Sequence, residues 1–465
     1  MKLWILTPIA ERDVHFYLET ADQLRSQGDL KIVFVSFYQP GNRLIESRGY
    51  EVFDPYPQTR VEPPASWTTE MVEKTFQTPP LKDLILHEKL TFGLSSDDEV
   101  IGKFRRYFYA MDQLLEKIEK QHPSSEKVIL QELAGFVGPL SLFYTGMKRG
   151  WTHWWTEPSF FKGRIHFLKN NLNLHIPETT TSAESEKQVR SYLQKAIEQK
   201  VVVAAVKDAH HYKDMGLAKV FNPTNFRKLA KKLYFKYAKG QRQEFDHIWN
   251  HVQRYLMMLK NRYQNASSYA SLDSLPAEAP LFFFPFHVQL DFSLTIRTPQ
   301  CLDQLALIEK ILPQLPKGSI LVAKEHPASI GCLDQGRLEK LLAHPQFRLL
   351  HPQTNSHDVL DRTKAVITIN SKVGAEALSR GLPVLTFGRA FYTEKGLTPH
   401  FASWDQVKAW AEAAIGPSAH SMAASPEWIH FLENVWRNSV PTELYDLNPN
   451  NVRDFSQGIQ KILSL

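Results

Sequence analysis

The sequence has little of what marks secreted, membrane-spanning or metal-binding proteins. Cysteine occurs only twice in 465 residues, at Cys301 and Cys332, so we expect two buried free thiols in a reducing compartment and no disulfide framework or cysteine metal site. No stretch approaches the roughly 20 apolar residues that a membrane-spanning helix needs. The apolar run at residues 1–8 is too short, and too soon followed by acidic residues, for a signal peptide. These absences favour a cytoplasmic protein.

A dinucleotide fingerprint is also missing, because no Gly-x-Gly-x-x-Gly motif follows the first expected strand. What is present is ordinary for globular proteins: 43% hydrophobic and 22% charged residues. A chain of 465 residues is too long for one small core, so two or three domains are expected.

Apolar runs of strand length alternate with helical patterns in both halves of the chain. Strands are expected at 1–8, 31–37, 127–131 and 152–161, and again at 281–285, 319–323, 347–350, 365–369 and 382–387. This alternation predicts an α/β fold with two Rossmann-like domains in a GT-B-like arrangement, facing a cleft that would be the default active site.

A stretch rich in small residues and proline, 265–280, marks the expected boundary between these domains. We predict an N-terminal, acceptor-side domain over 1–270 with a helical insertion at 222–264. A C-terminal nucleotide-sugar domain is predicted over 280–440, followed by a terminal helix over 441–465 that crosses back. Residues 54–80, rich in proline and threonine, are predicted to be a long surface loop.

The segment 364–398 carries the clearest candidate for a ligand site. The expected strand 365–369 is followed at once by two good N-cap residues, Asn370 and Ser371, and the helix is expected to stop at Gly381. A helix N-terminus at the carboxyl edge of a parallel sheet offers free N–H groups and a positive dipole end to anions. We therefore expect Asn370, Ser371 and Lys372 to hold a phosphate. The alternative is one more α/β repeat with ordinary capping.

Three further features point to the same edge or to the expected cleft. Glu376 lies about one turn beyond the cap, within reach of a ribose hydroxyl. Lys324 and His326 follow the expected strand 319–323, and with Ser371 they would cradle a nucleotide phosphate without a metal. Glu157 stands before a proline at a strand end and is placed to point into a cleft, unless it is a loop glutamate in solvent.

Residues 222–264 are strongly basic and are interleaved with aromatic residues at helical spacing. Only two acidic residues, Glu244 and Asp246, accompany ten basic ones. The basic residues are Arg227, Lys228, Lys231, Lys232, Lys236, Lys239, Arg242, Arg254, Lys260 and Arg262. We expect a basic amphipathic helical hairpin, broken near Gly240, that binds an anionic membrane surface or an acidic polymer, or that simply covers the core. Nucleic acid is not expected, because no recognised binding module accompanies the patch.

Several motifs together resemble a known family. They are KEHP at 324–327, INSKVGAEALSRGLPVLTFG at 369–388, the FY…GLT segment at 391–398, and FFPFHVQLDFSL at 283–294. QELAGFVGPL and EPSFFKGR, at 131–140 and 157–164, add to the resemblance. The chain is similar to the capsule polysaccharide biosynthesis family of β-Kdo transferases, which are retaining enzymes that use CMP-β-Kdo. It departs from the family's FYAGWGLT, because here the segment is FYTEKGLT.

The resemblance implies transfer of Kdo to a capsular or other surface glycan, or to a lipid-linked acceptor, by double displacement. It implies that Asp291 is the nucleophile, with His287 and Gln289 beside it, and that Glu157 is the acid/base or a second attachment point. The alternative for Asp291 is a helix-capping role. Further residues carry over as the CMP site, without cofactor or metal: Lys324, His326, Pro327, Ser371 and Glu376.

Two other functions stay open at this point. One is a related transferase with another CMP- or CDP-linked donor, such as a sialyltransferase or a polyol-phosphate transferase. The other is a non-catalytic member that binds glycan. We expect a cytoplasmic location in each case, and the basic segment suggests a peripheral position at the inner face of the membrane.

Overall fold

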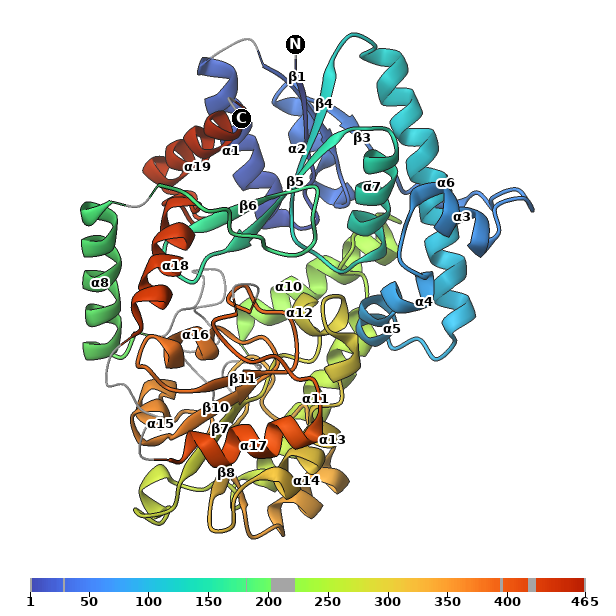
Figure 1. The fold of residues 1–465 in the computed structure, drawn as a ribbon. Helices are drawn as coiled ribbons and strands as arrows, with labels where there is room; N and C mark the ends of the chain where they lie inside the picture. The colour runs from blue at the N-terminus through green and yellow to red at the C-terminus, as the bar shows by residue number, and fades with distance from the viewer. Residues whose placement is uncertain are drawn as a thin grey trace. The chain divides into compact units, whose positions relative to one another are not determined.

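The computed structural model describes residues 2–27, 30–180, 182–201, 222–393, 396–416 and 424–463. The chain divides into two compact units, each built around its own sheet (Figure 1). Unit 1 comprises Met1–Leu174, Ala205–Val252 and Ser439–Leu465, and unit 2 comprises His175–Ala204 and Gln253–Asn438. The predicted pair of Rossmann-like α/β sheets is confirmed.

The described residues of unit 1 form a six-stranded sheet in the order β3-β2-β1-β4-β5-β6. Its strands are β1 (Lys2–Leu6), β2 (Lys31–Val35), β3 (Glu51–Phe53), β4 (Glu126–Glu132), β5 (Thr152–Pro158) and β6 (Ile165–Lys169). Neighbouring strands are parallel except β6, which pairs antiparallel with β5. This is a doubly wound order whose direction reverses between β1 and β4.

Successive side chains of β1 enter different cores on the two faces of the sheet. Trp4 and Leu6 of β1 pack with the terminal helix, including Phe455, whereas Leu3 and Ile5 pack on the opposite face with residues such as Met111. Strands buried on both faces need continuous apolar runs, and β1 and β2 have them. Unit 1 is therefore a sheet with helices on both faces.

The helices of unit 1 come from three separate parts of the chain. They are α1 (Glu11–Gln27), α2 (Asn42–Ser47), α3 (Thr69–Phe76), α4 (Leu81–Leu84), α5 (Leu86–Phe92), α6 (Asp97–Gln121), α7 (Val137–Lys148), α10 (Pro223–Leu233) and α19 (Pro449–Leu463). Short 3-10 helices lie at Gln39–Gly41 and Gln58–Arg60, and a π-helical turn at Tyr234–Ala238 continues α10. α19 packs on α1. Figure 1 shows the two helices side by side.

The described residues of unit 2 form a five-stranded sheet in the order β11-β10-β7-β8-β9. The strands are β7 (Leu281–Pro285), β8 (Ile320–Lys324), β9 (Phe347–Leu350), β10 (Ala365–Thr368) and β11 (Val384–Thr386), and every pairing is parallel. In chain order this sheet is again doubly wound, and its direction reverses between β7 and β10. Each of its strands was predicted from an apolar run, with ends within two residues.

Unit 2 places helices of varied length around this sheet. They are α8 (Ala183–Glu198), α12 (Phe292–Thr295), α13 (Gln304–Ile311), α14 (Gln335–Leu342), α15 (Ser356–Arg362), α16 (Lys372–Leu378), α17 (Trp404–Ala414) and α18 (Pro426–Arg437). Short 3-10 helices lie at Leu272–Ser274, Pro299–Cys301 and Leu312–Gln314. α13, α14 and α17 bury one face of the sheet in a core with Phe282, Phe284 and Leu321.

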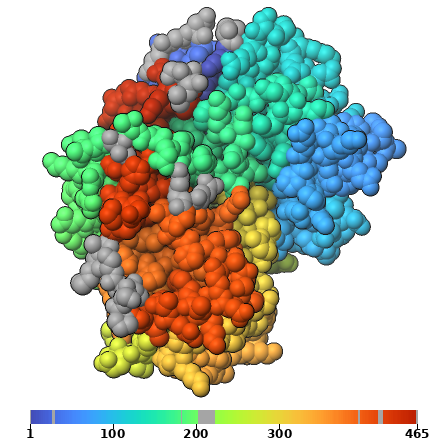
Figure 2. Space-filling view, viewed as in Figure 1, coloured from blue at the N-terminus to red at the C-terminus, as the bar shows by residue number. Residues whose placement is uncertain are grey.

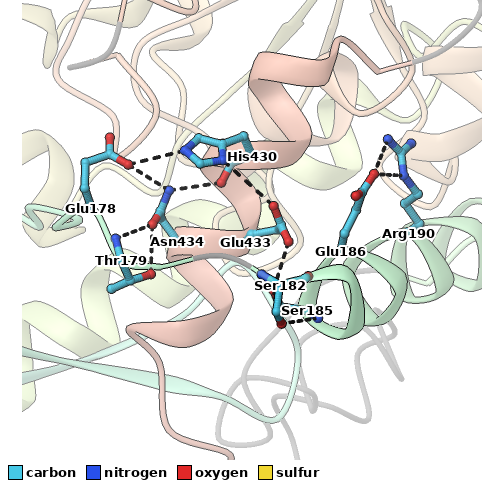
Figure 3. A network of polar contacts seen from close by, with 9 residues as sticks. All are labelled: Glu178, Thr179, Ser182, Ser185, Glu186, Arg190, His430, Glu433 and Asn434. Atoms are coloured by element: carbon cyan, nitrogen blue, oxygen red, sulfur yellow. Dashed lines mark hydrogen bonds and ion pairs between the residues drawn. The ribbon is translucent and has the colours of Figure 1, made fainter.

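The predicted domain boundary is wrong in two places. α8 belongs to unit 2, because it packs on α18 through buried Val189 and Leu193 and through a hydrogen bond of 2.9 Å from the hydroxyl of Ser185 to Glu433. The segment leading into α8 adds two hydrogen bonds from Thr179 to Asn434 (Figure 3). Figure 2 shows α8 in green beside α18 in orange-red.

The second error concerns the expected linker at 265–280. Its residue Ala270 exchanges backbone hydrogen bonds with the chain at β9, from Ala270 to Leu349 (2.8 Å) and from His351 to Ala270 (3.2 Å). The linker is thus part of unit 2. The division between the units falls at residue 252, within α11 (Ile248–Asn265).

The prediction of one long loop over 54–80 is also wrong. Thr68 caps α3 there by accepting a hydrogen bond from the backbone of Met71, and Val72 and Phe76 are buried four residues apart. By contrast, the predicted helices on either side of Gly240 are present as α10 with its π-helical turn, and as α11. Within the described ranges, we find no helix with both the length and the apolar character needed to cross a membrane.

Candidate functional site

The candidate site of unit 2 lies at the carboxyl edge of its sheet, where the strand order reverses. β7 leads into His287 and β10 leads into Asn370, and these two strands are neighbours. The backbone N–H of Asn370 donates a hydrogen bond to Nε2 of His287 over 3.3 Å. Ligands of open α/β sheets bind at such a reversal. The structure therefore brings together two of the predicted residues at the expected place.

His287 is held in a neutral and oriented state. Its backbone N–H and carbonyl both bond the side chain of Gln304, at 2.8 and 3.1 Å. Burial lowers the pKa of His287 to about 4, although the charge of Asp291 opposes this shift. Because Nε2 accepts from Asn370, the proton of the neutral ring lies on Nδ1. Gln304 was not predicted, because no pattern in the sequence marks a buried glutamine that fixes a loop.

The side chain of Asn370 makes two contacts within unit 2. Its amide nitrogen donates to the backbone carbonyl of Ser293 and to the hydroxyl of Thr298, both at 3.0 Å. These contacts join the end of β10 to α12, through Ser293, and to the loop after α12, through Thr298. Asn370 thus positions the site, and its amide donors are already used within unit 2.

Ser371 is the N-cap of α16, as the sequence predicts. Its hydroxyl oxygen accepts from the backbone N–H of Val373 at 3.2 Å, which leaves the hydroxyl proton to be donated. The carbonyl of Ser371 accepts a hydrogen bond of 2.6 Å from the buried hydroxyl of Tyr392. Gly374 allows this contact, because a Cβ there would lie 2.1 Å from that hydroxyl.

Tyr392 was not predicted as a site residue, although it belongs to the FY pair of the resemblance. Little can be said about the departure of this segment from the family pattern. The two residues of FYTEKGLT that depart most from the family pattern, Glu394 and Lys395, lie outside the described residues.

The KEHP segment begins at Lys324, the last residue of β8, which is the other neighbour of β7. Nδ1 of His326 accepts from the backbone N–H of Ala328 at 3.1 Å, so the proton of a neutral ring lies on Nε2. The next residue, Pro327, is buried and begins the turn. Glu325 is buried and accepts from the hydroxyl of Tyr269 (2.8 Å) and the backbone of Gly331 (2.7 Å), so its role is structural.

Lys324 and Glu376 form the buried charged part of the site. Burial lowers the pKa of Lys324 to about 8, and the attraction of Glu376 works against that shift. Burial raises the pKa of Glu376 to about 7, against the attraction of Arg380, Lys324 and Lys372. The ammonium of Lys324 donates to the carbonyl of Thr354 at 3.0 Å. Among the described residues, none forms a hydrogen bond or ion pair of its own with the carboxylate of Glu376.

Lys372 is the first residue of α16 and is half-buried. Its charge reaches Glu376, as the pKa of that carboxyl indicates. A buried carboxylate surrounded by cations, beside a capped helix start, is suited to accept hydrogen bonds from hydroxyl groups of a ligand.

Asp291 has the capping role that the sequence left open as its alternative. It is the N-cap of α12, and its carboxylate accepts from the backbone N–H of Ser293 at 2.7 Å. Desolvation would raise the pKa of Asp291, but the hydrogen bonds from Ser293, with smaller electrostatic contributions from His287 and Arg297, outweigh it and lower the pKa. The side chain is exposed and ionised at neutral pH. A carboxylate can cap a helix and also act as a nucleophile, so the nucleophile role of Asp291 stays a prediction.

Gln289 and Glu157 complete the predicted set. The side-chain oxygen of Gln289 accepts from Arg254 of α11 at 3.2 Å, within unit 2. Glu157 lies in unit 1, near the end of β5, where it pairs with His166 of β6 and is half-buried. Its joint role with Asp291 stays a prediction. No group of three or more His, Cys, Asp or Glu that could bind a metal ion occurs in the part of the chain that the structure describes.

The comparison with protein families supports the resemblance found in the motifs. Residues 191–414 match the family model described as capsule polysaccharide biosynthesis protein, and they include every predicted site residue of unit 2. This part of the chain is therefore similar to the capsule polysaccharide biosynthesis family. A curated relative, Protein FixF of Sinorhizobium fredii, is 30% identical over 123 residues, which are 26% of this chain and 29% of that protein. The chain thus spans less than a third of this relative's length.

Solved structures with a similar course of the chain have low identity and low similarity scores. The β-Kdo 2,4 transferase KpsC of Thermosulfurimonas dismutans has 11% identity and a TM-score of 0.40, covering 73% of this chain and 88% of that one. The β-Kdo 2,7 transferase KpsC of the same organism has 14% identity and a TM-score of 0.34, covering 80% and 95%. The structure of S. aureus MnaA with UDP has 10% identity and a TM-score of 0.30, covering 100% and 98%.

Proposed function

We propose that this protein is a glycosyltransferase that moves Kdo from CMP-β-Kdo to a capsular or other surface glycan, or to a lipid-linked acceptor. One observation supports this proposal most strongly. In a unit that matches the capsule polysaccharide biosynthesis family, polar residues converge at the carboxyl edges of three adjacent strands, β10, β7 and β8. That edge is where an open α/β sheet holds a nucleotide.

The donor's nucleotide takes its contacts from α16 and the KEHP turn. The hydroxyl of Ser371 and the Nε2–H of His326 donate to the phosphate, with Lys372 close by as a positive charge. Glu376 accepts from ribose hydroxyls, because its buried carboxylate has no partner of its own among the described residues. Lys324 keeps that carboxylate partly ionised. These contacts need no metal or cofactor.

The chemistry proceeds by two displacements at the anomeric carbon. An oxygen of the Asp291 carboxylate forms a bond to that carbon as the bond to the phosphate oxygen breaks, and CMP leaves with the electron pair. The acceptor hydroxyl then attacks the same carbon, gives its proton to Glu157, and displaces Asp291. Two inversions retain the β configuration. The hydrogen bond from the backbone N–H of Ser293 stabilises the ionised state of Asp291.

The test is incubation of the protein with a panel of CMP-Kdo, CMP-sialic acid and CDP-linked polyols, with CMP and CDP release read by chromatography. CMP release from CMP-Kdo alone supports the proposal. Release from another donor instead indicates a related transferase, such as a sialyltransferase or a polyol-phosphate transferase. No release from any donor, together with glycan binding, indicates a non-catalytic member. With a lipid-linked acceptor the enzyme would act as a peripheral protein at the cytoplasmic face of the membrane.

A further inference from the structure

Exposed apolar side chains are concentrated in one segment of the chain. Of the ten large hydrophobic side chains that are exposed among the described residues, seven lie between residues 226 and 263. They are Phe226, Tyr234, Tyr237, Trp249, Leu256, Met257 and Tyr263, and Tyr263 is 87% exposed. Single exposed apolar residues are normal on protein surfaces, but a concentration in one segment marks an interaction site.

α10 and the π-helical turn after it bury none of their residues. Yet α10 carries Phe226, Leu229 and Leu233, which recur at intervals of three and four and therefore share one face of the helix. The apolar face of a helix in a soluble protein normally covers a core. Here Leu229 and Leu233 are only half-buried and Phe226 is exposed, so the apolar face of α10 is incompletely covered.

The same segment keeps a surplus of positive charge after folding. One of its two carboxylates, Asp246, is 3.2 Å from the ammonium of Lys236, and the other, Glu244, is buried. Lys231 pairs with Glu11. By contrast, the described residues offer no ion-pair partner to Arg227, Lys228 or Lys239.

α11 (Figure 1, yellow-green) carries further exposed apolar side chains. Trp249, Leu256 and Tyr263 follow one another at intervals of seven residues, which is two helical turns, and all three are exposed. Its first turn is linked to the π-helical turn, since Nε1 of Trp249 donates to the hydroxyl of Tyr237 at 3.0 Å. Aromatic rings with polar tips are the side chains that favour the interface between lipid and water.

We propose that α10, its π-helical turn and the first turn of α11 bind the surface of an anionic lipid bilayer. Cations attract the lipid headgroups, and the aromatic and apolar side chains enter the boundary between headgroups and acyl chains. An acidic polymer would use the cations but would leave the exposed apolar residues without a role. This inference deepens the proposed function by giving it a partner, but it does not depend on the donor chemistry.

The experiment measures partition of the full-length protein onto vesicles of phosphatidylglycerol and phosphatidylcholine, against vesicles of phosphatidylcholine alone. Charge is tested with Arg227→Glu, Lys228→Glu and Lys239→Glu combined. Lys231 and Lys236 are spared because their reversal would also break ion pairs. The matched control reverses three exposed lysines of unit 2: Lys310, Lys340 and Lys408. Apolar contact is tested with Phe226→Ala and Tyr237→Ala, and its control is Val61→Ala with Leu447→Ala.

Wild type is expected to bind only the anionic vesicles, and binding should weaken with added salt. Each basic residue near such a surface contributes about fivefold, so the triple reversal should reduce partition about a hundredfold while its control does not. The aromatic pair should reduce partition about tenfold or more. Equal binding of the triple variant and its control would overturn the proposal. So would full binding by the aromatic variant, which would indicate a polyanion site.

Thermal stabilisation by CMP serves as the independent readout. It should be the same in wild type and in every one of these variants. Loss of vesicle binding with unchanged CMP stabilisation supports the lipid surface whatever the donor is. Absence of CMP stabilisation in wild type would count against the proposed donor and leave the vesicle result standing.

Discussion

The backbone N–H of Asn370 donates to Nε2 of His287, and this contact joins the carboxyl ends of β10 and β7 at the reversal of strand order. This hydrogen bond fixes the tautomer of His287. It also holds Asn370, the residue before the N-cap of α16, in place. Asn370 adds the hydroxyl of Thr298 and the carbonyl of Ser293 to the same framework. The candidate site is therefore positioned by contacts between residues 72 to 83 positions apart in the chain.

The first prediction concerns the phosphate of the donor. His326→Ala and Ser371→Ala should each weaken CMP binding, measured by calorimetry, by roughly ten- to a hundredfold, because each removes a charge-assisted hydrogen bond. His344→Ala is the matched control, since Nδ1 of His344 accepts from the backbone two residues on, as in His326, but precedes β9. Ser403→Ala, which removes the N-cap of α17, controls for lost capping. Wild-type affinity in both site variants would refute the phosphate assignment.

The second prediction concerns the start of α16. Gly374→Ala places a Cβ 2.1 Å from the hydroxyl of Tyr392, which is fully buried and cannot move aside without loss of its bond to Ser371. We expect a loss of about 1–3 kcal/mol in stability and weaker CMP binding. At Gly336 in α14 the nearest atom to a new Cβ is 3.8 Å away, so Gly336→Ala should stabilise by up to about 1 kcal/mol. Denaturant melts of the two variants that coincide would show that the close approach is unimportant.

Some of the contacts behind these two predictions can be predicted from the sequence, and others cannot. The strands of unit 2 and the cap at Ser371 follow from local patterns, apolar runs and an N-cap residue, so they could be predicted. The bonds of Thr298, Gln304 and Tyr392 could not, because they depend on which distant segments meet at the sheet edge. The same holds for α8, whose place on α18 rests on Ser185 and Glu433, far apart in the chain.

The third prediction concerns pH. Burial raises the pKa of Glu376 from 4.5 in the unfolded chain to about 7, so the folded state holds a proton that the unfolded state releases. Stability is therefore lost as pH rises from 4.5 to about 7, and it changes no further through this group. Glu376→Gln removes this loss, so its melting temperature relative to wild type should rise over that range, by an equivalent of about 1–3 kcal/mol.

Ligand binding by Glu376 should show the opposite trend. A carboxylate accepts from ribose hydroxyls better than a carboxyl group does, so CMP affinity of the wild type should increase as pH rises through about 7. Glu376→Gln should bind weakly and without this rise, whereas Glu339→Gln, at an exposed position of α14, should behave as wild type. A Gln variant with wild-type affinity and pH profile would exclude the ribose contact.

The last prediction tests the mechanism through the cap of α12. Asp and Asn are about equally good N-caps, so Asp291→Asn should keep the fold, the melting temperature and CMP binding. Turnover should fall by several orders of magnitude, because the amide cannot form the covalent intermediate. Asp334→Asn is the matched control, since Asp334 caps α14 in the same way, and its turnover should stay at the wild-type level.

Glu157→Gln should slow the second step and allow one Kdo mass to accumulate on the protein, detected by intact mass spectrometry. Near-wild-type turnover of Asp291→Asn would remove its nucleophile role, and an α-linked product would exclude double displacement, because a single displacement inverts the anomeric carbon.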